Sequence, residues 1–393
     1  MIYFDTKKIE AAYSFVKDKL FYPKTSLIYD HIILNRVHEW PTPEEIATVY
    51  PDPCGYGTGM EDGMINGGTM LDACLIRYEL EHDEESAEFA KKIVDGMLNC
   101  AFSAKTEGYL PRGVCPADGK SHYPDSSRDQ YTMFAFGMHR YLRSSLCTEE
   151  ERKKIAKACV GVARRAEKNI VKETGYDMLT DDGGPTLNVV MWGEKLGNHE
   201  FLRLPMLYLL AYEASGDEHW FEKYREIRQE AYDKSLPMTS YWAMYTLQQM
   251  QVSVLVCHDV DEDEGWRSRY LELMNQVADY AEKAVVNVRN KMQRYNNYND
   301  SQKSFRELET KPAVNFINLG YKNAVTACRS DMFDYFALED TAQLAIITKL
   351  VPGRKSNIDV EKLFIEGFEK IDFSKHERNL PLFFVAGYYR SII

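Results

Sequence analysis

The sequence predicts an all-α protein, an (α/α)6 toroid of six helical hairpins, from two observations. Helices of two kinds alternate along the chain, one apolar on nearly every side and the other with a single apolar stripe. A helix that is apolar all round is surrounded by protein, whereas a helix with one stripe covers it from outside. The turn from an inner to an outer helix is short, while most connections that lead into an inner helix are long. No linker or sheet pattern interrupts this succession, so we expect residues 1–393 to form one domain.

Four inner–outer pairs are clear. The predicted inner helices are Met70–Leu80, Tyr131–Leu142, Phe201–Tyr212 and Tyr241–Cys257. After each comes a polar break and then a helix with one apolar stripe, which is Phe89, Ile93 and Met97 in the first pair. The breaks end with acidic residues, which favour a helix N-terminus by capping it and by interacting with its dipole.

Weaker signals complete six hairpins at the two ends of the chain. We expect Ile9–Leu20 to pair with Leu27–Val37, Leu338–Leu350 to pair with Asp359–Phe368, and Pro381–Tyr389 to close the ring. The alternative, a helical solenoid of the tetratricopeptide kind, needs a repeat of about 34 residues. The equivalent tyrosines, Tyr78, Tyr141 and Tyr212, are 63 and 71 residues apart, so the solenoid is excluded.

The composition limits which binding partners and which cellular compartment we expect for the protein. Lys and Arg number 48 against 60 Asp and Glu, a net charge of −12, which disfavours nucleic acid and anionic membranes as partners. No apolar run approaches the length of a membrane span. The eight cysteines form no CxxC pair and the N-terminus has no secretory pattern, so we expect buried thiols and a cytoplasmic protein.

The long connections predict where a site lies. They are Glu39–Ile65, Ser103–Ser127, Glu173–Asn198 and Gln293–Phe336. The inner helices of a toroid run the same way, so these loops gather on the face formed by the inner-helix N-termini. Long loops over a rigid scaffold are the usual position of a binding or catalytic site.

The first candidate is the glycine-rich segment Cys54–Gly68, which holds Glu61 and Asp62 just before an inner helix. It lacks the Gly-Lys-Ser/Thr of a P-loop and the G-x-G-x-x-G spacing. Its glycines instead suit close approach of backbone to a ligand, and the helix dipole favours ionised carboxylates there. The alternative is that Glu61 and Asp62 are an N-cap and its neighbour.

The second candidate is Arg128 with Asp129, again at the start of an inner helix. Asp125 or Ser126 is expected to be the N-cap, which leaves Arg128 and Asp129 inside the first turn without a capping role. An arginine gains nothing from the positive end of a helix, so we expect it to bind a carboxylate of the protein or of an acidic ligand. The alternative is a structural ion pair between inner helices.

Aromatic residues and one histidine complete the predicted site. Trp192, in a polar loop, and Tyr241 and Trp242, at the start of the fourth inner helix, are suited to stacking on sugar rings. His199 is equally consistent with a site residue and a capping residue. Local spacing supports no metal site and no serine-hydrolase elbow, and we predict no cofactor.

The sequence contains two motifs of interest, Gly57–Asp62 running into Ile65–Asp72, and Ser127–Thr132. These motifs resemble the six-hairpin glycosidase-like (α/α)6 superfamily, nearest to relatives of the unsaturated glucuronyl and rhamnogalacturonyl hydrolases. In those hydrolases two aspartates at the starts of inner helices matter, and one protonates an enol-ether double bond so that water adds. By position, the resemblance implies Asp62 and Asp129. The arginine-glycine-tryptophan phrase of those hydrolases is absent, which leaves the exact reaction open.

Our leading hypothesis is a glycoside hydrolase for oligosaccharides, with uronate-containing ones as one option. Asp129 would be the general acid/base, Asp62 or Glu61 its partner, and Arg128 a binder of carboxylate or hydroxyl groups, with His199 and the three aromatic residues contacting sugar. The alternatives are a sugar epimerase or polysaccharide lyase, with His199 or His122 as base, and a non-catalytic sugar-binding protein. A terpene cyclase ranks lowest, and we make no prediction of oligomeric state.

Overall fold

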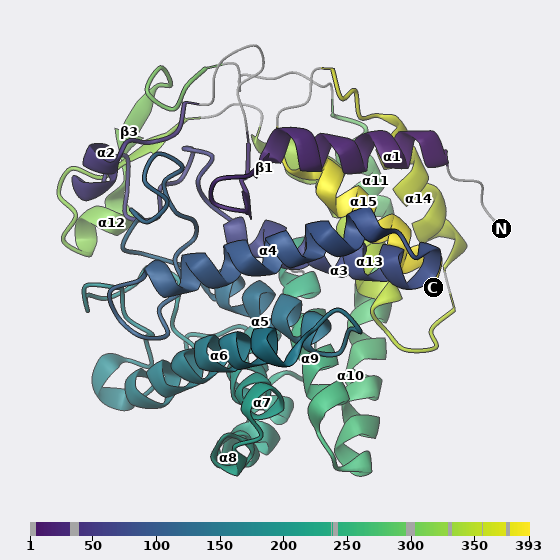
Figure 1. Ribbon diagram of the computed structural model, residues 1–393. Helices are drawn as coiled ribbons and strands as arrows, with labels where there is room; N and C mark the ends of the chain where they lie inside the picture. The colour runs from purple at the N-terminus through teal and green to yellow at the C-terminus, as the bar shows by residue number, and fades with distance from the viewer. Residues whose placement is uncertain are drawn as a thin grey trace.

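The computed structural model describes residues 5–31, 39–236, 238, 243–295, 303–328, 332–355, 357–374 and 378–393, with side chains from residue 336 onward in the range 332–355. Over these ranges the protein is all-α, as predicted (Figure 1). Short strands form two antiparallel pairs, β1 (Phe21–Tyr22) with β2 (Leu27–Ile28) and β3 (Thr310–Pro312) with β4 (Val325–Ala327).

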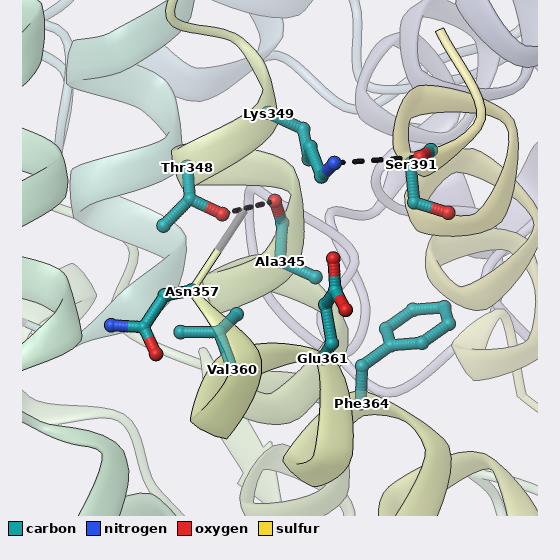
Figure 2. Close-up of a pocket in the computed structure, with 8 residues that line it drawn as sticks. All are labelled: Ala345, Thr348, Lys349, Asn357, Val360, Glu361, Phe364 and Ser391. Carbon is teal, nitrogen blue, oxygen red and sulfur yellow. Dashed lines mark hydrogen bonds between the residues drawn. The ribbon is translucent and has the colours of Figure 1, made fainter. Parts of the chain in front are cut away.

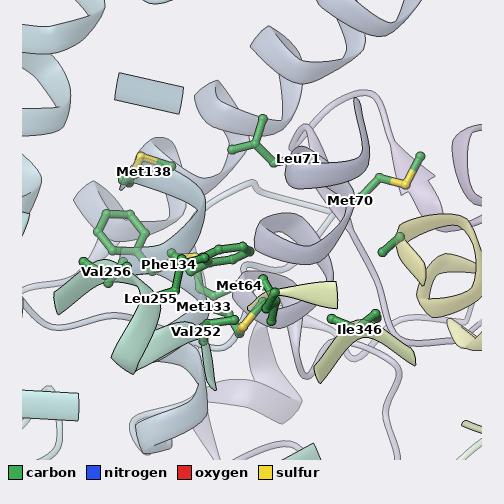
Figure 3. Packing of buried hydrophobic residues seen from close by; sticks show 14 of the residues in the cluster. Met64, Met70, Leu71, Met133, Phe134, Met138, Val252, Leu255, Val256 and Ile346 are labelled. Carbon is green, nitrogen blue, oxygen red and sulfur yellow. The ribbon is translucent and has the colours of Figure 1, made fainter. Parts of the chain in front are cut away.

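Helices of the apolar kind form the centre of the molecule. They are α3 (Gly63–Glu81), α5 (Arg128–Leu142), α7 (Arg203–Ser215), α9 (Met244–Val260), α13 (Met332–Lys349) and α15 (Leu380–Ser391). Each contacts the next in this order, and α15 contacts α3. Figure 3 shows the apolar packing between them, with Met64 of α3, Phe134 of α5 and Val252 of α9 gathered in one cluster.

Helices with one apolar face cover these. They are α1 (Thr6–Phe15), α4 (Glu84–Ser103), α6 (Glu149–Asn169), α8 (Glu218–Lys234), α10 (Glu264–Glu282) and α14 (Ile358–Glu369). In Figure 1, α4 lies in front of α3, and α1 runs beside α15. Acidic residues cap several of these outer helices: Asp83 accepts from the backbone N–H of Ser86, and Asp217 from that of His219, whereas α6 is capped by Thr148.

The remaining elements are short. They are a π-helix (Val16–Leu20), α2 (Pro43–Ala47), two 3₁₀ helices (Lys172–Thr174 and Asn198–Glu200), α11 (Val285–Met292) and α12 (Val314–Asn318). None of the helices in the ranges above is both long enough and apolar enough to cross a membrane.

The closest approach between inner helices depends on glycine. A Cβ atom on Gly68 of α3 would collide with the carbonyl oxygen of Met133 in α5, and a Cβ on Gly137 would lie 3.1 Å from the Cα of Gly68. The two helices therefore touch backbone to backbone. This contact fixes the relative positions of the N-termini of α3 and α5, where the candidate carboxylates lie.

The predicted helix Leu27–Val37 is wrong where the structure describes it. Leu27 and Ile28 form β2, which pairs with β1 across a turn that contains Pro23 and a left-handed Ser26 (φ 56°). A short apolar run does not distinguish strand from helix by periodicity alone. Residues 32–38 lie outside the described ranges. Among the described helices, α1 packs against α15.

The predicted N-cap of α5 is also wrong. The cap is Ser127, which makes no side-chain capping bond. The Asp125 carboxylate instead accepts from the backbone N–H groups of Ser126 and Leu187 at 2.8 and 2.9 Å. Asp125 therefore fastens a distant loop to the start of α5, a role that local sequence does not reveal.

Candidate active site

A cavity of about 560 Å³ lies at the N-terminal ends of α5, α7 and α9, within the range typical of ligand sites. Its charged lining residues are Arg112, Arg128, Asp129, Lys195, Glu200 and Arg203. The remaining lining residues are Tyr56, Ser127, Asn188, Gly197, His199, Ala243, Tyr245 and Thr246. Four cations face two carboxylates, so this cavity is positively charged although the chain as a whole carries −12.

Asp129 lies in the first turn of α5, as predicted, and lines the cavity. Its carboxylate accepts a hydrogen bond from Nη1 of Arg203, the first residue of α7. The Arg203 side chain is only 2% exposed, whereas that of Asp129 is 25% exposed. A buried arginine therefore holds a carboxylate that still reaches the cavity.

Asp62 is the N-cap residue of α3 but does not act as a cap through its side chain. Its backbone is left-handed (φ 62°), and its Oδ1 accepts from Arg112 Nη1 at 2.8 Å and Gln130 Nε2 at 2.7 Å. Left-handed backbone in a non-glycine residue is unfavourable and is often found at functional sites. The carboxylate is thus directed toward α5 rather than toward its own helix.

Several neighbouring charged groups, including Asp129, affect the pKa of Asp62. Burial raises the pKa of Asp62 to about 6, and the nearby carboxylates of Asp30 and Asp129 also raise it, while Arg112 and the hydrogen bond from Gln130 lower it. The geometric link between the two aspartates is Gln130, which donates to Asp62 and directly follows Asp129 in α5.

Arg112 links Asp62 to the cavity. Its Nη2 donates to the hydroxyl of Tyr56 at 2.8 Å, and its guanidinium lies 4.6 Å from the centre of the Tyr56 ring. Both residues line the cavity. Neither was predicted as a site residue.

Several polar atoms of the lining lack partners. Among the described residues, Arg112 Nε, Arg203 Nε and Ser127 Oγ are buried and make no hydrogen bond. Unsatisfied buried donors are rare because each costs about 1–3 kcal/mol. Other such atoms occur elsewhere in the described residues, but these three belong to the wall of one cavity, where a ligand rich in acceptor atoms would satisfy them.

Arg128 binds a carboxylate of the protein. Its Nη2 lies 2.6 Å from Oε1 of Glu200, and its Nη1 donates to the carbonyl oxygen of Val190 at 3.1 Å. The pair joins α5 to the 3₁₀ helix Asn198–Glu200 and is therefore not the predicted alternative, an ion pair between inner helices. The ion pair that does join two inner helices is Arg203–Asp129. Arg128 nevertheless remains part of the cavity wall.

His199 also lines the cavity and is buried. Burial lowers the pKa of His199 to about 4, and the cations Arg203 and Arg128 contribute to the lowering, although Glu200 acts in the opposite direction. The imidazole is therefore neutral at pH 7.

Glu61 directly precedes Asp62 in the chain, but its side chain has other neighbours. Its side chain is buried beside Asp30 and His31, and its Oε1 accepts from the backbone N–H of Gly57 at 3.0 Å. Burial raises the pKa of Glu61 well above its usual range, and Asp30 and Asp62 raise it further. Neither Glu61 nor Asp62 is among the described residues that line the cavity, but Asp62 is bonded to Arg112, which does line it.

The predicted aromatic residues differ in position. Trp192 is not in the lining of the cavity; its ring packs edge-on against Phe201 at 5.7 Å, and Lys234 Nζ lies over it at 5.6 Å. Tyr241 and Trp242 lie outside the described residues. Tyr245, which follows Trp242 by three residues, does line the cavity and is 44% exposed.

Two other pockets are less suited to be an active site. One of about 410 Å³ contains His122, but both ring nitrogens are satisfied, by Lys120 O and by Asp181 Oδ2, each at 3.0 Å. The pocket in Figure 2, between α13, α14 and the end of α15, has a volume of about 10 Å³. That is roughly the space one water molecule needs.

Arg112 and Arg203 carried weak signals in the sequence. Arg203 is the one charged residue in the apolar run Phe201–Tyr212, and Arg112 lies between Pro111 and Gly113 in a long loop. Their partners are 74 and 50 residues away in the chain, so neither ion pair follows from local spacing.

Comparison of the sequence with models of protein families and with curated proteins gave no match.

Proposed function

We propose that the protein is a glycoside hydrolase that acts on oligosaccharides containing an acidic sugar. One observation carries the proposal: Asp62 and Asp129 begin neighbouring helices, Asp62 is hydrogen-bonded to the residue that follows Asp129, and each is held by a buried arginine that lines a cationic cavity. Two carboxyl groups held in position are the minimum that acid/base catalysis needs to hydrolyse a glycosidic bond or to hydrate an enol ether.

The proposal includes an (α/α)6 toroid. In support, the six inner helices contact one another in chain order, α15 contacts α3, and α1 and α15 pair although they are at opposite ends of the chain. In such a toroid the first helix of the chain is an outer one and the last is its inner partner. The free thiols of the eight cysteines are in keeping with a cytoplasmic enzyme.

In this proposal Asp129 exchanges the proton with the substrate. One oxygen is engaged by Arg203, and the side chain still reaches the cavity. Asp62, with one oxygen engaged by Arg112 and Gln130, is its partner and positions the attacking water or a sugar hydroxyl. Glu61, the other predicted partner, faces Asp30 and His31, so we prefer Asp62.

Arg128, Lys195 and Arg203 suit the carboxylate of an acidic sugar. Arginine forms paired hydrogen bonds with carboxylates, and the lining has two more cations than carboxylates. The buried Nε of Arg203, which has no partner among the described residues, is one donor that such a ligand would satisfy.

The test is turnover of unsaturated uronyl disaccharides, followed by loss of the ultraviolet absorbance of their double bond, together with a panel of aryl glycosides. Asp129→Asn keeps the acceptor for Arg203 and removes the transferable proton, so turnover should fall by about 10²–10⁴-fold. Asp95→Asn, at an exposed position of α4, is the matched control. Full activity in Asp129→Asn, or no turnover of either substrate class by the unaltered protein, would contradict the proposal.

The second candidate is an epimerase or lyase on the same scaffold. The observation that favours it is the neutral His199 in the cavity wall, since a neutral imidazole can accept a proton from a sugar carbon. Exchange of a sugar C–H hydrogen for deuterium in D₂O, lost in His199→Gln and kept in Asp129→Asn, would select this candidate over the hydrolase.

A further inference from the structure

We propose that Asp30, His31 and Glu61 bind a divalent transition-metal ion such as Zn²⁺ or Mn²⁺. This site is separate from the cavity described above. It lies where the segment after β2 meets the glycine-rich loop that precedes α3.

The three side chains present ligand atoms to one another in the interior. One such atom from each lies within 4.8 Å of the others, and Asp30 Oδ2 is 3.6 Å from His31 Nδ1. Their exposures are 6%, 4% and 8%, so water does not screen the two carboxylates from each other.

Glu61 supplies the independent observation. Its Oε1 accepts from Gly57 N, but Oε2 is buried and has no hydrogen-bond partner among the described residues. A buried carboxylate oxygen without a donor is costly, and a second carboxylate beside it increases the cost. A cation between Glu61 and Asp30 removes both penalties at once.

The other oxygen of each carboxylate is already positioned. Asn379 Nδ2 donates to Asp30 Oδ1 at 2.7 Å, as Gly57 N does to Glu61 Oε1 at 3.0 Å. Hydrogen bonds of this kind orient metal ligands.

Gly59 allows the loop to pass against His31. Its φ is +80°, and a Cβ atom there would lie 2.9 Å from the carbonyl oxygen of His31 and 3.3 Å from its Cε1. A larger residue would push the glycine-rich loop, and Glu61 with it, away from the histidine.

The ligand types select the ion. An imidazole with two carboxylates suits Zn²⁺ or Mn²⁺, whereas Ca²⁺ and Mg²⁺ prefer oxygen ligands throughout. Ligands at about 2.0–2.2 Å from one Zn²⁺ lie roughly 3.3 Å apart, so binding draws Asp30 and His31, 3.6 Å apart, together by about 0.3 Å, and no pair by more than about 1.5 Å. The ion would thereby fasten the loop before Asp62 to the segment after β2.

The experiment measures metal binding by the full chain and needs no catalytic assay, so its outcome is independent of the proposed function. Protein treated with a chelator and dialysed is titrated with Zn²⁺ or Mn²⁺ alone, and the metal bound and the thermal midpoint are recorded. We expect one equivalent of ion to bind and the midpoint to rise.

Glu61→Gln should raise the midpoint of the metal-free protein, because it removes the repulsion with Asp30, and should abolish the response to metal. Asn379→Ala should weaken binding by roughly 10–100-fold. Glu213→Gln, a carboxylate beside a different histidine, is the matched control and should bind the ion normally. If neither ion shifts the midpoint, or if the shift survives in Glu61→Gln, the proposal is wrong.

Discussion

The two ends of the inner helices handle buried charge in different ways. Toward the C-terminal ends the charges satisfy one another: His139 lies between Glu213 and Asp259 at 2.7 and 3.3 Å. Toward the N-terminal ends, Arg112 and Arg203 each retain a buried donor without a partner among the described residues. A closed network holds a fold together, and an incomplete one is what a ligand completes.

A second closed network strengthens the comparison. Asp72 of α3 accepts from Arg140 of α5 at 2.7 Å and from Arg390 of α15 at 2.6 Å. Burial alone would raise the pKa of Asp72, but the two arginines lower it below its usual value. This carboxylate stays charged and structural, in contrast to Asp62, whose pKa is raised.

The largest expected effect comes from removing one charge from the network around His139. Glu213→Gln should lower the free energy of unfolding by roughly 2–3 kcal/mol, because it removes one partner of a buried charged histidine while Asp259 remains. Urea denaturation measures the change. A loss below about 0.5 kcal/mol would show that the network contributes little.

The same network predicts a pH dependence. Burial alone would lower the pKa of His139, but Glu213 and Asp259 raise it above the ordinary 6.5. The stabilisation is therefore complete below pH 6.5 and lost as pH rises through the raised pKa. The pKa of Glu213 is lowered from 4.5, since His139 and Arg143 outweigh burial, so this contribution is lost at acid pH.

The difference in unfolding free energy between the unaltered protein and His139→Gln should therefore be greatest between pH 4.5 and 6.5. Other groups that face this histidine, Arg143 and His258 through Glu213 and Asp259, are retained in both proteins. A difference that grows steadily above pH 6.5 would contradict the assignment.

A smaller effect is expected from a change in the lining of the cavity. Lys195 is an exposed cation of the cavity lining, and Lys195→Gln should raise KM for an acidic sugar by roughly fivefold, or about 1 kcal/mol, with kcat preserved. Lys172→Gln, at an exposed position away from the lining, should leave KM unchanged. The increase should shrink at high salt, and equal effects on neutral and acidic sugars would argue against a charge contact.

The smallest effect tests a residue that the sequence placed in the site. Trp192 packs against Phe201 and Lys234 rather than lining the cavity. Trp192→Phe keeps an aromatic ring there, so KM should stay within about twofold of the unaltered value. A tenfold rise would mean that Trp192 stacks on sugar, as its sequence context predicted.

Local pattern explains what could be predicted. The helices around Met70, Tyr131 and Phe201 follow from apolar residues on every side, and the outer helices follow from their stripes and acidic caps. Asp62 and Asp129 were predicted to lie at helix starts, and the structure places Asp62 at the N-cap of α3 and Asp129 in the first turn of α5. Leu27–Ile28 was mistaken for helix because short apolar runs are ambiguous.

What escaped prediction depends on long-range contacts. Asp125 fastens Leu187, 62 residues away, and Arg203 holds Asp129, 74 residues away. His31 and Glu61 come together from separate segments, so no spacing motif marks them. Local sequence indicated the positions of charged residues, but their partners are set by the packing of α3, α5 and α7.

The most direct test of the contrast compares Asp129→Asn with Glu213→Gln in one experiment, by urea denaturation and by turnover of the uronyl disaccharide per folded molecule. We predict that Asp129→Asn loses about 10²–10⁴-fold in turnover per folded molecule, and also some stability, because the buried Arg203 loses its charged partner. Glu213→Gln should lower stability and leave turnover per folded molecule unchanged. If both variants lose stability and neither loses turnover, the two ends do not differ in role and the account is wrong.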